Sequence, residues 1–295
     1  MKNIFLKTLA AMLLLITVSM NAQDFQGKAV YLSKTTLDID FSSSGIPADR
    51  IKMIKERMKN NLERTYKFSF DKTASIYKQQ EQLEQAGGPG GGRGGMRMMM
   101  FGGGASGEYY KNIQAKTVAK ENEFSGKKFL VKDDLVTYEW KMEQETKMIG
   151  NYLCFKASTP IERAVRPEIQ FGRRNVTEED RKEREQKAKE MENMKEVIIV
   201  TAWYTMDIPV GHGPGDYWGL PGLILEVDAG ETKILCTKIV LNPKEKTDIS
   251  EPSKGKVVTQ KEYDKIVEEK TKEMRERFQN ERQKSGGGQH IRIGG

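Results

Sequence analysis

His212 and Asp216, four residues apart in the segment GHGPGD, are side chains that could do acid–base or metal chemistry. A zinc site needs three or four ligands at definite spacing, however, and this pair supplies only two. The chain has one other histidine, His290, and contains no GxSxG sequence of the kind that holds a serine nucleophile. We therefore expect His212 to be an ordinary loop residue, and we favour a protein with no catalytic activity and no cofactor. An unrecognised hydrolase acting through His212 is the alternative.

A methionine cluster offers a different chemistry. Met96, Met98, Met99 and Met100 lie in the segment 87–107, in which eleven residues are glycine. Thioether sulfur suits Cu(I), so a Cu(I)-binding accessory protein is a second alternative. The interpretation we prefer is a flexible loop whose methionines pack loosely or contact a partner, because no histidine or cysteine lies near them.

Cys154 and Cys236 are the two cysteines of the chain, and each lies in a strand-like run. If their strands are neighbours in the sheet, the two can form a disulfide, which an exported protein would keep. Two buried free thiols are the other interpretation.

The N-terminus has the layout of a secretory signal peptide. Lys2 and Lys7 precede an uncharged, mostly apolar run at 8–20, and Ala22 marks the expected cleavage site. Residues 1–22 are therefore expected to be removed, leaving a mature chain with no transmembrane segment, located in the periplasm or at the outer membrane. Export, together with a modest and dispersed positive charge, argues against a nucleic-acid partner.

Alternating apolar and polar residues, separated by turn residues, predict an antiparallel sheet. The fold class expected is mainly β, with a curved or barrel-like antiparallel sheet and flanking helices. One helix is expected over residues 47–63, with Ile51, Ile54, Met58 and Leu62 on one face. The expected strands are residues 25–40, 65–71, 73–78, 108–118, 127–131, 135–142, 147–157 (with a turn at Gly150), 196–206, 223–228 and 232–241.

A single β domain is expected over residues 23–285, interrupted by two insertions. The glycine- and methionine-rich loop 87–107 is the first. Residues 161–195 are the second, and their acid-before-base pairs four residues apart predict a solvated, projecting helix. A charged helix is expected over 260–284, followed by a flexible glycine-rich tail at 286–295.

The hexapeptide GLPGLI at 219–224 places two glycines and a proline before a strongly β-forming run. Gly219 and Gly222 allow positive φ, and Pro221 fixes its own φ, so the three predict a sharp and reproducible turn. Two interpretations follow. The turn closes the end of the sheet, or it forms the wall of a ligand or partner groove with nearby aromatic rings. The residues of this candidate site are Trp203, Tyr204, Pro214, Tyr217, Trp218, Gly219, Leu220, Pro221 and Gly222.

The stretch AWYTMDIPVGHGPGDYWGLPGLILEV, residues 202–227, resembles the signature of the GLPGLI family of exported proteins, found mainly in Bacteroidota. An upstream run, Gly150-Asn151-Tyr152 with Cys154 and Lys156-Ala157, is also similar to the family pattern. The family has no established biochemical activity. The resemblance implies an exported envelope protein. The setting of the family implies that such a protein assists transport across the outer membrane. Together with the residues themselves, it favours a non-enzymatic protein that binds an apolar ligand or a protein partner.

Overall fold

The structure, a computed structural model, describes residues 25–36, 41, 45–80, 107–165, 183, 186, 190 and 194–285. The expected signal peptide 1–22, nearly all of the loop 87–107, most of the insertion 161–195 and the tail 286–295 lie outside these residues. Their sequence-based interpretations therefore stay predictions.

Within the described residues, twelve strands form one sheet in the order β12-β6-β5-β4-β3-β2-β1-β11-β10-β9-β8-β7. Neighbouring strands are antiparallel except β12 and β6, which are parallel. The strands are β1 (Gly27–Thr35), β2 (Glu63–Phe70), β3 (Ala74–Gln79), β4 (Tyr109–Asn112), β5 (Thr117–Phe124), β6 (Lys127–Asp134), β7 (Lys141–Ile149), β8 (Tyr152–Ala164), β9 (Lys195–Thr205), β10 (Leu223–Ala229), β11 (Thr232–Leu241) and β12 (Lys256–Val258).

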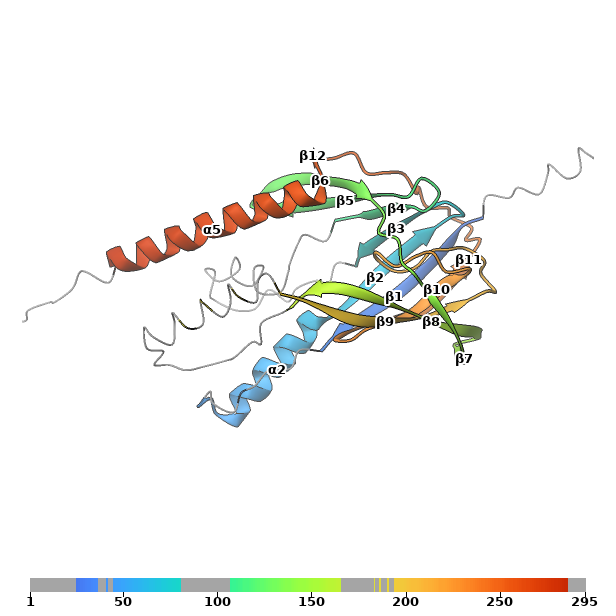
Figure 1. Cartoon of the computed structure of the whole chain (residues 1–295), viewed down its shortest axis with the longest axis horizontal. Coiled ribbons are helices and arrows are strands. Elements are labelled where there is room, and N and C mark those ends of the chain that lie inside the picture. Colours follow the sequence, from blue (N-terminus) through green and yellow to red (C-terminus); the bar gives the residue numbers. More distant parts are fainter. Residues whose placement is uncertain are drawn as a thin grey trace, which may run out of the picture.

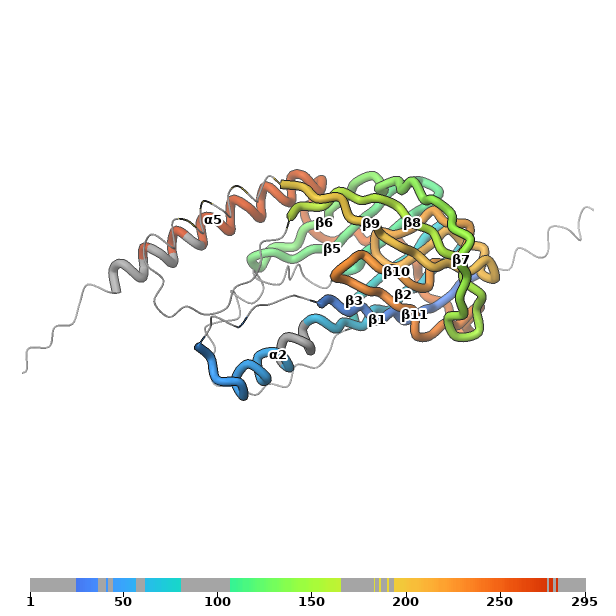
Figure 2. Tube along the Cα trace, turned by 60° about the horizontal axis from the view of Figure 1, so that its bottom comes forward, coloured from blue at the N-terminus to red at the C-terminus, as the bar shows by residue number. Residues whose placement is uncertain are grey.

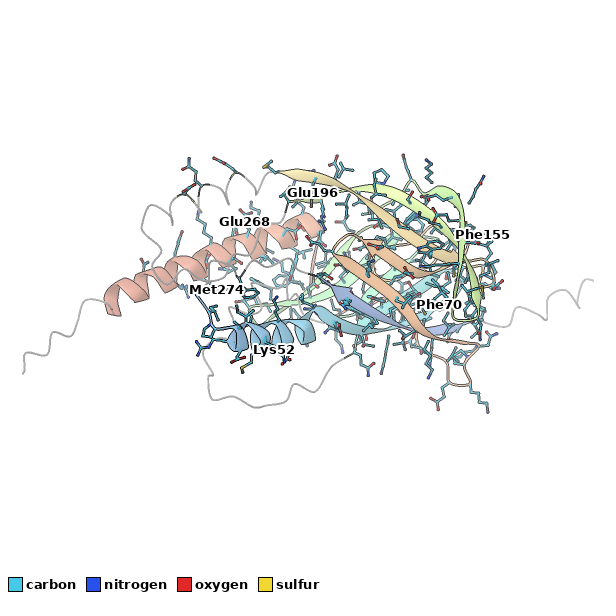
Figure 3. All side chains as sticks on the ribbon, turned by 90° about the horizontal axis from the view of Figure 1, so that it is seen from below. Lys52, Phe70, Phe155, Glu196, Glu268 and Met274 are labelled. Atoms are coloured by element: carbon cyan, nitrogen blue, oxygen red, sulfur yellow. The ribbon has the colours of Figure 1, made fainter. Side chains whose placement is uncertain are left out.

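The sheet is curved and open, with β12 and β7 as its edges (Figures 1 and 2). Helices α2 (Ala48–Leu62) and α5 (Gln260–Ser285) extend away from the same end of the sheet. Figure 3 shows them, with Lys52 and Met274, reaching beyond the densely packed side chains around Phe70. The mainly β, antiparallel and curved fold expected from the sequence is confirmed, although the sheet does not close. In the described part of the chain, neither helix is long and apolar enough to cross a membrane.

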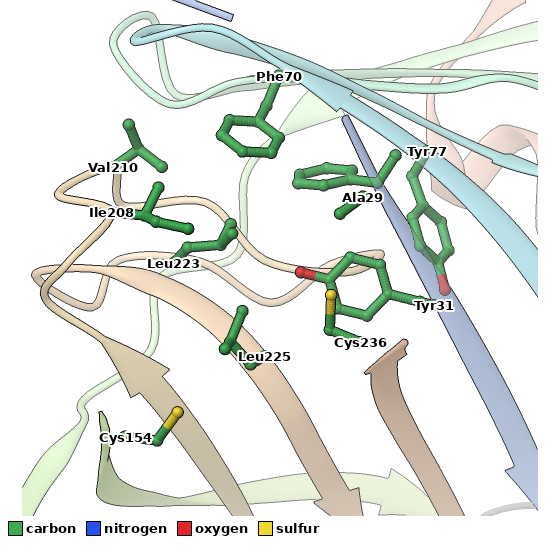
Figure 4. Packing of buried hydrophobic residues seen from close by; sticks show 11 residues of the cluster. Ala29, Tyr31, Phe70, Tyr77, Cys154, Ile208, Val210, Leu223, Leu225 and Cys236 are labelled. Carbon is green, nitrogen blue, oxygen red and sulfur yellow. The ribbon is translucent and has the colours of Figure 1, made fainter. Parts of the chain in front are cut away.

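The core of the molecule forms around the connection between β9 and β10, which we call the motif loop (residues 206–222). Ile208 and Val210 of this loop pack with Leu223 of β10 against Phe70 of β2 (Figure 4). This first core cluster also holds Tyr31, whose hydroxyl donates a 2.7 Å hydrogen bond to the main-chain oxygen of Ile224 in β10. A second cluster contains Leu220 and Ile224 together with buried side chains of β8 and β9. The motif loop is therefore part of the core and joins the two halves of the sheet.

Several boundaries differ from the sequence-based expectation. The expected strand 108–118 is broken by a turn, because the Asn112 side chain accepts hydrogen bonds from the main-chain nitrogens of Gln114 and Ala115. The expected strand 135–142 is wrong over 135–140, which is irregular and lies beside the motif loop. Residues 161–164 continue strand β8 and are not helical, because they pair with β9. The short strand β12 was not expected.

Candidate functional site

The motif loop folds back on itself through its main chain. The main-chain nitrogen of Gly219 donates to the main-chain oxygen of Gly211 at 2.9 Å. The main-chain nitrogen of Ile224 donates to the main-chain oxygen of His212 at 3.0 Å. The nitrogen of Leu223 donates to the oxygen of Ile208 at 2.9 Å. These bonds close the loop at the start of β10, so the turn leads directly into a buried strand.

The two glycines of the hexapeptide serve different purposes. Gly219 has a φ of +92°, which disfavours any residue with a Cβ. Gly222 does not have a positive φ, contrary to the expectation. It is needed because a Cβ at this position would lie 1.9 Å from the main-chain oxygen of Thr205. Between the two glycines, Leu220 is buried in the second core cluster and Pro221 is exposed.

Lys111 of β4 is a buried lysine that sequence reasoning missed. Its side chain crosses to the motif loop and donates to the main-chain oxygens of Gly213, Gly215 and Tyr217, at 3.0, 2.9 and 2.8 Å. Burial lowers the pKa of Lys111 to about 7, and the nearby Asp216 carboxylate opposes this shift. Three carbonyl acceptors match the three hydrogens of an ammonium group. Lys111 therefore clamps the loop, and its hydrogens are directed at backbone oxygens.

Asp216 of the motif loop contacts β4, the strand that carries Lys111, and the neighbouring strand β5. Its Oδ1 accepts a 2.5 Å hydrogen bond from the Tyr109 hydroxyl and lies 3.4 Å from the Lys120 ammonium. The Lys120 ammonium also lies 4.8 Å from the centre of the Tyr109 ring. Burial, followed by the Asp216 charge, raises the pKa of Tyr109 well above its ordinary value. This group fixes the loop to β4 and β5.

His212 is fully buried between phenylalanines. Its ring lies 6.3 Å from the Phe68 ring and 6.2 Å from the Phe70 ring, measured between centroids. Burial lowers its pKa to about 3, the positive charge of Lys111 adds to this, and the Asp71 backbone opposes it. Within the described residues neither ring nitrogen makes a hydrogen bond of good geometry. The structure does not bring His212 and Asp216 together, since Asp216 is an exposed residue facing Tyr109.

The irregular segment 135–140 packs aromatic side chains against the motif loop. The Tyr138 and Tyr217 rings stack with centroids 5.8 Å apart. The Trp140 indole nitrogen donates to the main-chain oxygen of Trp218 at 2.8 Å, and the Trp218 indole donates to the oxygen of Val136 at 2.7 Å. Burial, with the negative charge of Asp216 second, raises the pKa of Tyr217 to about 12. Tyr138 and Trp140 were not predicted as site residues, although their aromatic composition is a signal.

Trp203 and Tyr204 do not lie on the same face, because adjacent residues of a strand point to opposite sides. Trp203 packs at the edge of the first core cluster, with the Lys147 ammonium 4.2 Å from its ring centre. Tyr204 is buried in the second cluster beside Trp140 and Tyr217. The expected aromatic wall therefore includes Tyr204, Tyr217 and Trp218 but not Trp203. Pro214, also expected there, is buried and its oxygen accepts a hydrogen bond from the Tyr217 nitrogen.

Cys154 and Cys236 are both buried free thiols, so the disulfide interpretation is wrong for this structure. Cys154 lies on β8 and Cys236 on β11, and two strands separate them in the sheet. Burial raises the pKa of each thiol to about 11. The methionines Met96, Met98, Met99 and Met100 lie outside the described residues, and copper binding stays a prediction. Among the residues that are described, no three His, Cys, Asp or Glu side chains gather as metal ligands.

Comparison with solved structures gives weak similarities. The chain is 12% identical to PNGF-II in its C2 crystal form, with a TM-score of 0.46, and 13% identical to the P21 form, with a TM-score of 0.44. Each alignment covers 82% of this chain but 32% and 33% of PNGF-II, so the chain spans about a third of that protein's length. LprF from Mycobacterium bovis is 7% identical with a TM-score of 0.23, over 77% of this chain and 89% of LprF.

Sequence comparisons are as sparse. No curated protein matches the chain. One family model does match, over residues 140–226, and it is described as a protein of unknown function (Porph_ging). The matched segment begins at Trp140 and ends in β10, so it contains β7, β8, β9 and the whole motif loop.

Proposed function

We propose that this chain is an exported, non-enzymatic envelope protein that binds a protein partner through an apolar patch beside the motif loop. The signal-like N-terminus supports export. The unaltered hexapeptide, which lies inside the matched segment 140–226, supports membership of the GLPGLI type and a setting near outer-membrane transport.

The exposed side of the motif loop carries the observation that supports partner binding. Val136, Trp140, Met142, Trp218 and Pro221 form what we call the turn patch. Val136 is 61% exposed and Met142 is 52% exposed, while Trp140 and Trp218 are half-buried between them and the core. Aromatic side chains and methionine are enriched in protein interfaces, and exposed apolar patches mark sites of association.

Hydrogen bonds hold the turn patch in one arrangement. Each of its two indole N–H groups donates to a main-chain oxygen of the patch itself, Trp140 to Trp218 and Trp218 to Val136. The Met142 sulfur accepts from the Tyr204 hydroxyl at 3.3 Å. Since the polar atoms of these side chains are already paired, the patch presents apolar surface at little ordering cost on binding.

The reactive groups nearby support a non-catalytic role. Lys111 is buried and donates to three carbonyl oxygens, and His212 is buried among phenylalanine rings. The Asp216 carboxylate accepts a hydrogen bond from Tyr109 and forms an ion pair with Lys120. Each of these side chains is explained by holding the loop in place.

The expected partner is an envelope protein that presents apolar side chains. Glu139 and Lys141, both exposed, flank Trp140 in the chain, and Lys120 pairs with Asp216 of the motif loop at 3.4 Å, so opposite charges beside the patch offset each other. Steering by charge should therefore be weak, and the affinity should change little with salt.

Site-specific photo-crosslinking tests the proposal. A benzoylphenylalanine is placed at position 136 of the full chain, or at position 257 as the matched control, since Val136 and Val257 are 61% and 60% exposed. Crosslinking in the native envelope should give one discrete protein from position 136 and none from 257. Equal capture from both positions, or none from 136, would overturn the proposal.

A pair of tryptophan substitutions makes the result specific. Trp218→Ala should reduce capture about tenfold, as loss of an interface aromatic does, whereas Trp203→Ala, outside the turn patch, should leave it unchanged. Both variants must keep their cooperative urea unfolding. Capture counts as support only when the purified protein then binds the purified chain.

A further inference from the structure

A cavity of about 680 Å³ lies on the sheet face opposite to the first core cluster. Its lining comes mostly from outward-facing residues of β11, β1, β2 and β3, and Thr247, Asp248 and Ser250 close it from above. Ala29 and Phe68, whose side chains belong to the first core cluster, also line it. Its volume falls in the range, roughly 300–1,000 Å³, of pockets that hold small-molecule ligands. The turn patch contributes no residue to it.

Strand register places the lining residues in two rows. One row runs across the sheet as Lys238, Val30, Lys67 and Lys78. The neighbouring row runs as Val240, Lys28, Ser69 and Ile76. The floor is therefore apolar at Val30, Val240 and Ile76, and lysines stand around it.

The side chains of two of these lysines, Lys67 and Lys238, have no hydrogen-bond or ion-pair partner among the described residues. Lys78 pairs with Glu108 at 3.0 Å, and Lys28 donates to the main-chain oxygen of Glu245 at 2.8 Å. Lys67 and Lys238 flank Val30 on the two adjacent strands, which puts their Cα atoms about 10 Å apart. Lys67 also lies directly across from Lys78, an arrangement of like charges that is unfavourable until an anion is present.

The upper wall of the cavity is fixed to the sheet. The Gln26 side chain exchanges two hydrogen bonds with the main chain of Thr247, at 3.0 and 3.1 Å. Ile249 packs beside Ile76 in a separate apolar cluster. The Asp248 carboxylate also lines the cavity and accepts a 3.1 Å hydrogen bond from the Ser250 hydroxyl. With Glu108 it brings two acids against four lysines, so the lining is net positive.

We propose that this cavity binds a single-chain amphiphile with an acidic head group. The head group lies between Lys67 and Lys238, where it neutralises two unpartnered ammonium groups. The hydrocarbon chain covers Val30, Val240 and Ile76 beneath residues 247–250. This site is independent of the turn patch, and each can exist without the other.

Calorimetric titration of the full chain tests the ligand class with four probes: dodecanoate, dodecyl phosphate, dodecanol and inorganic phosphate. Both anionic amphiphiles should bind. Dodecanol should bind at least about tenfold more weakly, because it lacks the charge that pairs with lysine. Inorganic phosphate alone should not bind measurably. Equal binding of dodecanol and dodecanoate would overturn the proposal, as would binding of inorganic phosphate as tight as that of dodecyl phosphate.

Lysine substitutions locate the site. The double variant Lys67→Gln and Lys238→Gln should lose about tenfold or more in dodecanoate affinity. The matched double variant Lys128→Gln and Lys254→Gln, at exposed lysines outside the cavity, should bind like the wild type. Ser69→Trp, which fills the cavity, should also abolish binding. Unchanged affinity in the first double variant, or equal loss in the second, would contradict the assignment.

A binding measurement with lipid vesicles distinguishes a site for a single amphiphile from a surface that binds a membrane. Phosphatidylcholine vesicles containing phosphatidylglycerol present the same charge as a lipid layer. If the chain binds the vesicles but not dodecanoate, the proposal of a cavity for one molecule is overturned. If the chain binds dodecanoate more tightly than it binds the vesicles, the proposal is supported.

Discussion

The Lys111 ammonium on β4 lies 2.8 Å from the main-chain oxygen of Tyr217, two residues before the hexapeptide. This bond joins a strand in one half of the sheet to a loop that connects two strands in the other half. Two further carbonyl oxygens of the loop accept from the same nitrogen. The shape of the turn patch therefore depends on a residue more than a hundred positions earlier in the chain.

Lys111→Met is expected to lower the free energy of unfolding by about 2–4 kcal/mol, because one buried and two part-buried carbonyl oxygens lose their donor. Lys120→Met removes a lysine paired with a half-exposed carboxylate and should cost less than about 1 kcal/mol. Urea unfolding measures both. Similar midpoints for the two variants would show that Lys111 does not clamp the loop.

Stability should fall in mild acid because of His212. Its pKa is about 3 in the folded chain and 6.5 unfolded, so between these values the unfolded state binds the extra proton. Burial of the neutral His212 ring therefore makes its full contribution to the free energy of unfolding above pH 6.5, and this contribution is lost as the pH falls toward 3. At pH 5 the loss from this group is about 2 kcal/mol relative to pH 8.

Unfolding free energies of the wild type and His212→Phe, compared from pH 5 to pH 8, test this expectation. The variant should show a flatter pH dependence than the wild type, and His290→Gln should not. Parallel curves for His212→Phe and wild type would mean that His212 titrates normally in the folded state.

Gly222→Ala should be far more damaging than a change at an ordinary turn glycine. The new Cβ would meet the Thr205 oxygen at 1.9 Å, which forces β9 and β10 to shift. Gly230→Ala, in the hairpin between β10 and β11, places a Cβ in open space at a φ of +73° and should cost about 1 kcal/mol. Thermal unfolding checks the pair, and an equal loss at both positions would argue against close packing at the hexapeptide.

The two cysteines should behave as protected thiols. Burial and a raised pKa keep Cys154 and Cys236 protonated and inaccessible, so reaction with a thiol reagent at pH 8 should be slow in the native chain. After unfolding without a reductant, both thiols should react. Recovery of no free thiol in the unfolded chain would show a disulfide instead.

Local sequence pattern predicted the hairpins well, because their alternation and turn residues are local properties. Residues 223–228 and 232–241 agree closely with β10 and β11. The same rule failed at 135–140, where alternation reflects Tyr138 and Trp140 packing against the motif loop and not strand pairing.

The site was less predictable than the fold. Lys111 stands in the short run Tyr-Tyr-Lys-Asn, where alternation gives no reason to bury a lysine. Its carbonyl acceptors come from residues 213–217, so no local signal marks them. Asn112, in contrast, did carry a readable turn signal, since asparagine side chains commonly cap such turns.

The central claim is that the motif loop is a scaffold that presents apolar surface to a protein partner. Two matched substitutions, each of which introduces one negative charge, test it most directly. Val136→Glu and Val257→Glu alter two equally exposed valines, one inside the turn patch and one on β12. With the purified partner captured from position 136, Val136→Glu should raise the Kd at least about tenfold, and Val257→Glu should leave it within about twofold of wild type. Equal affinities for both variants would contradict the claim.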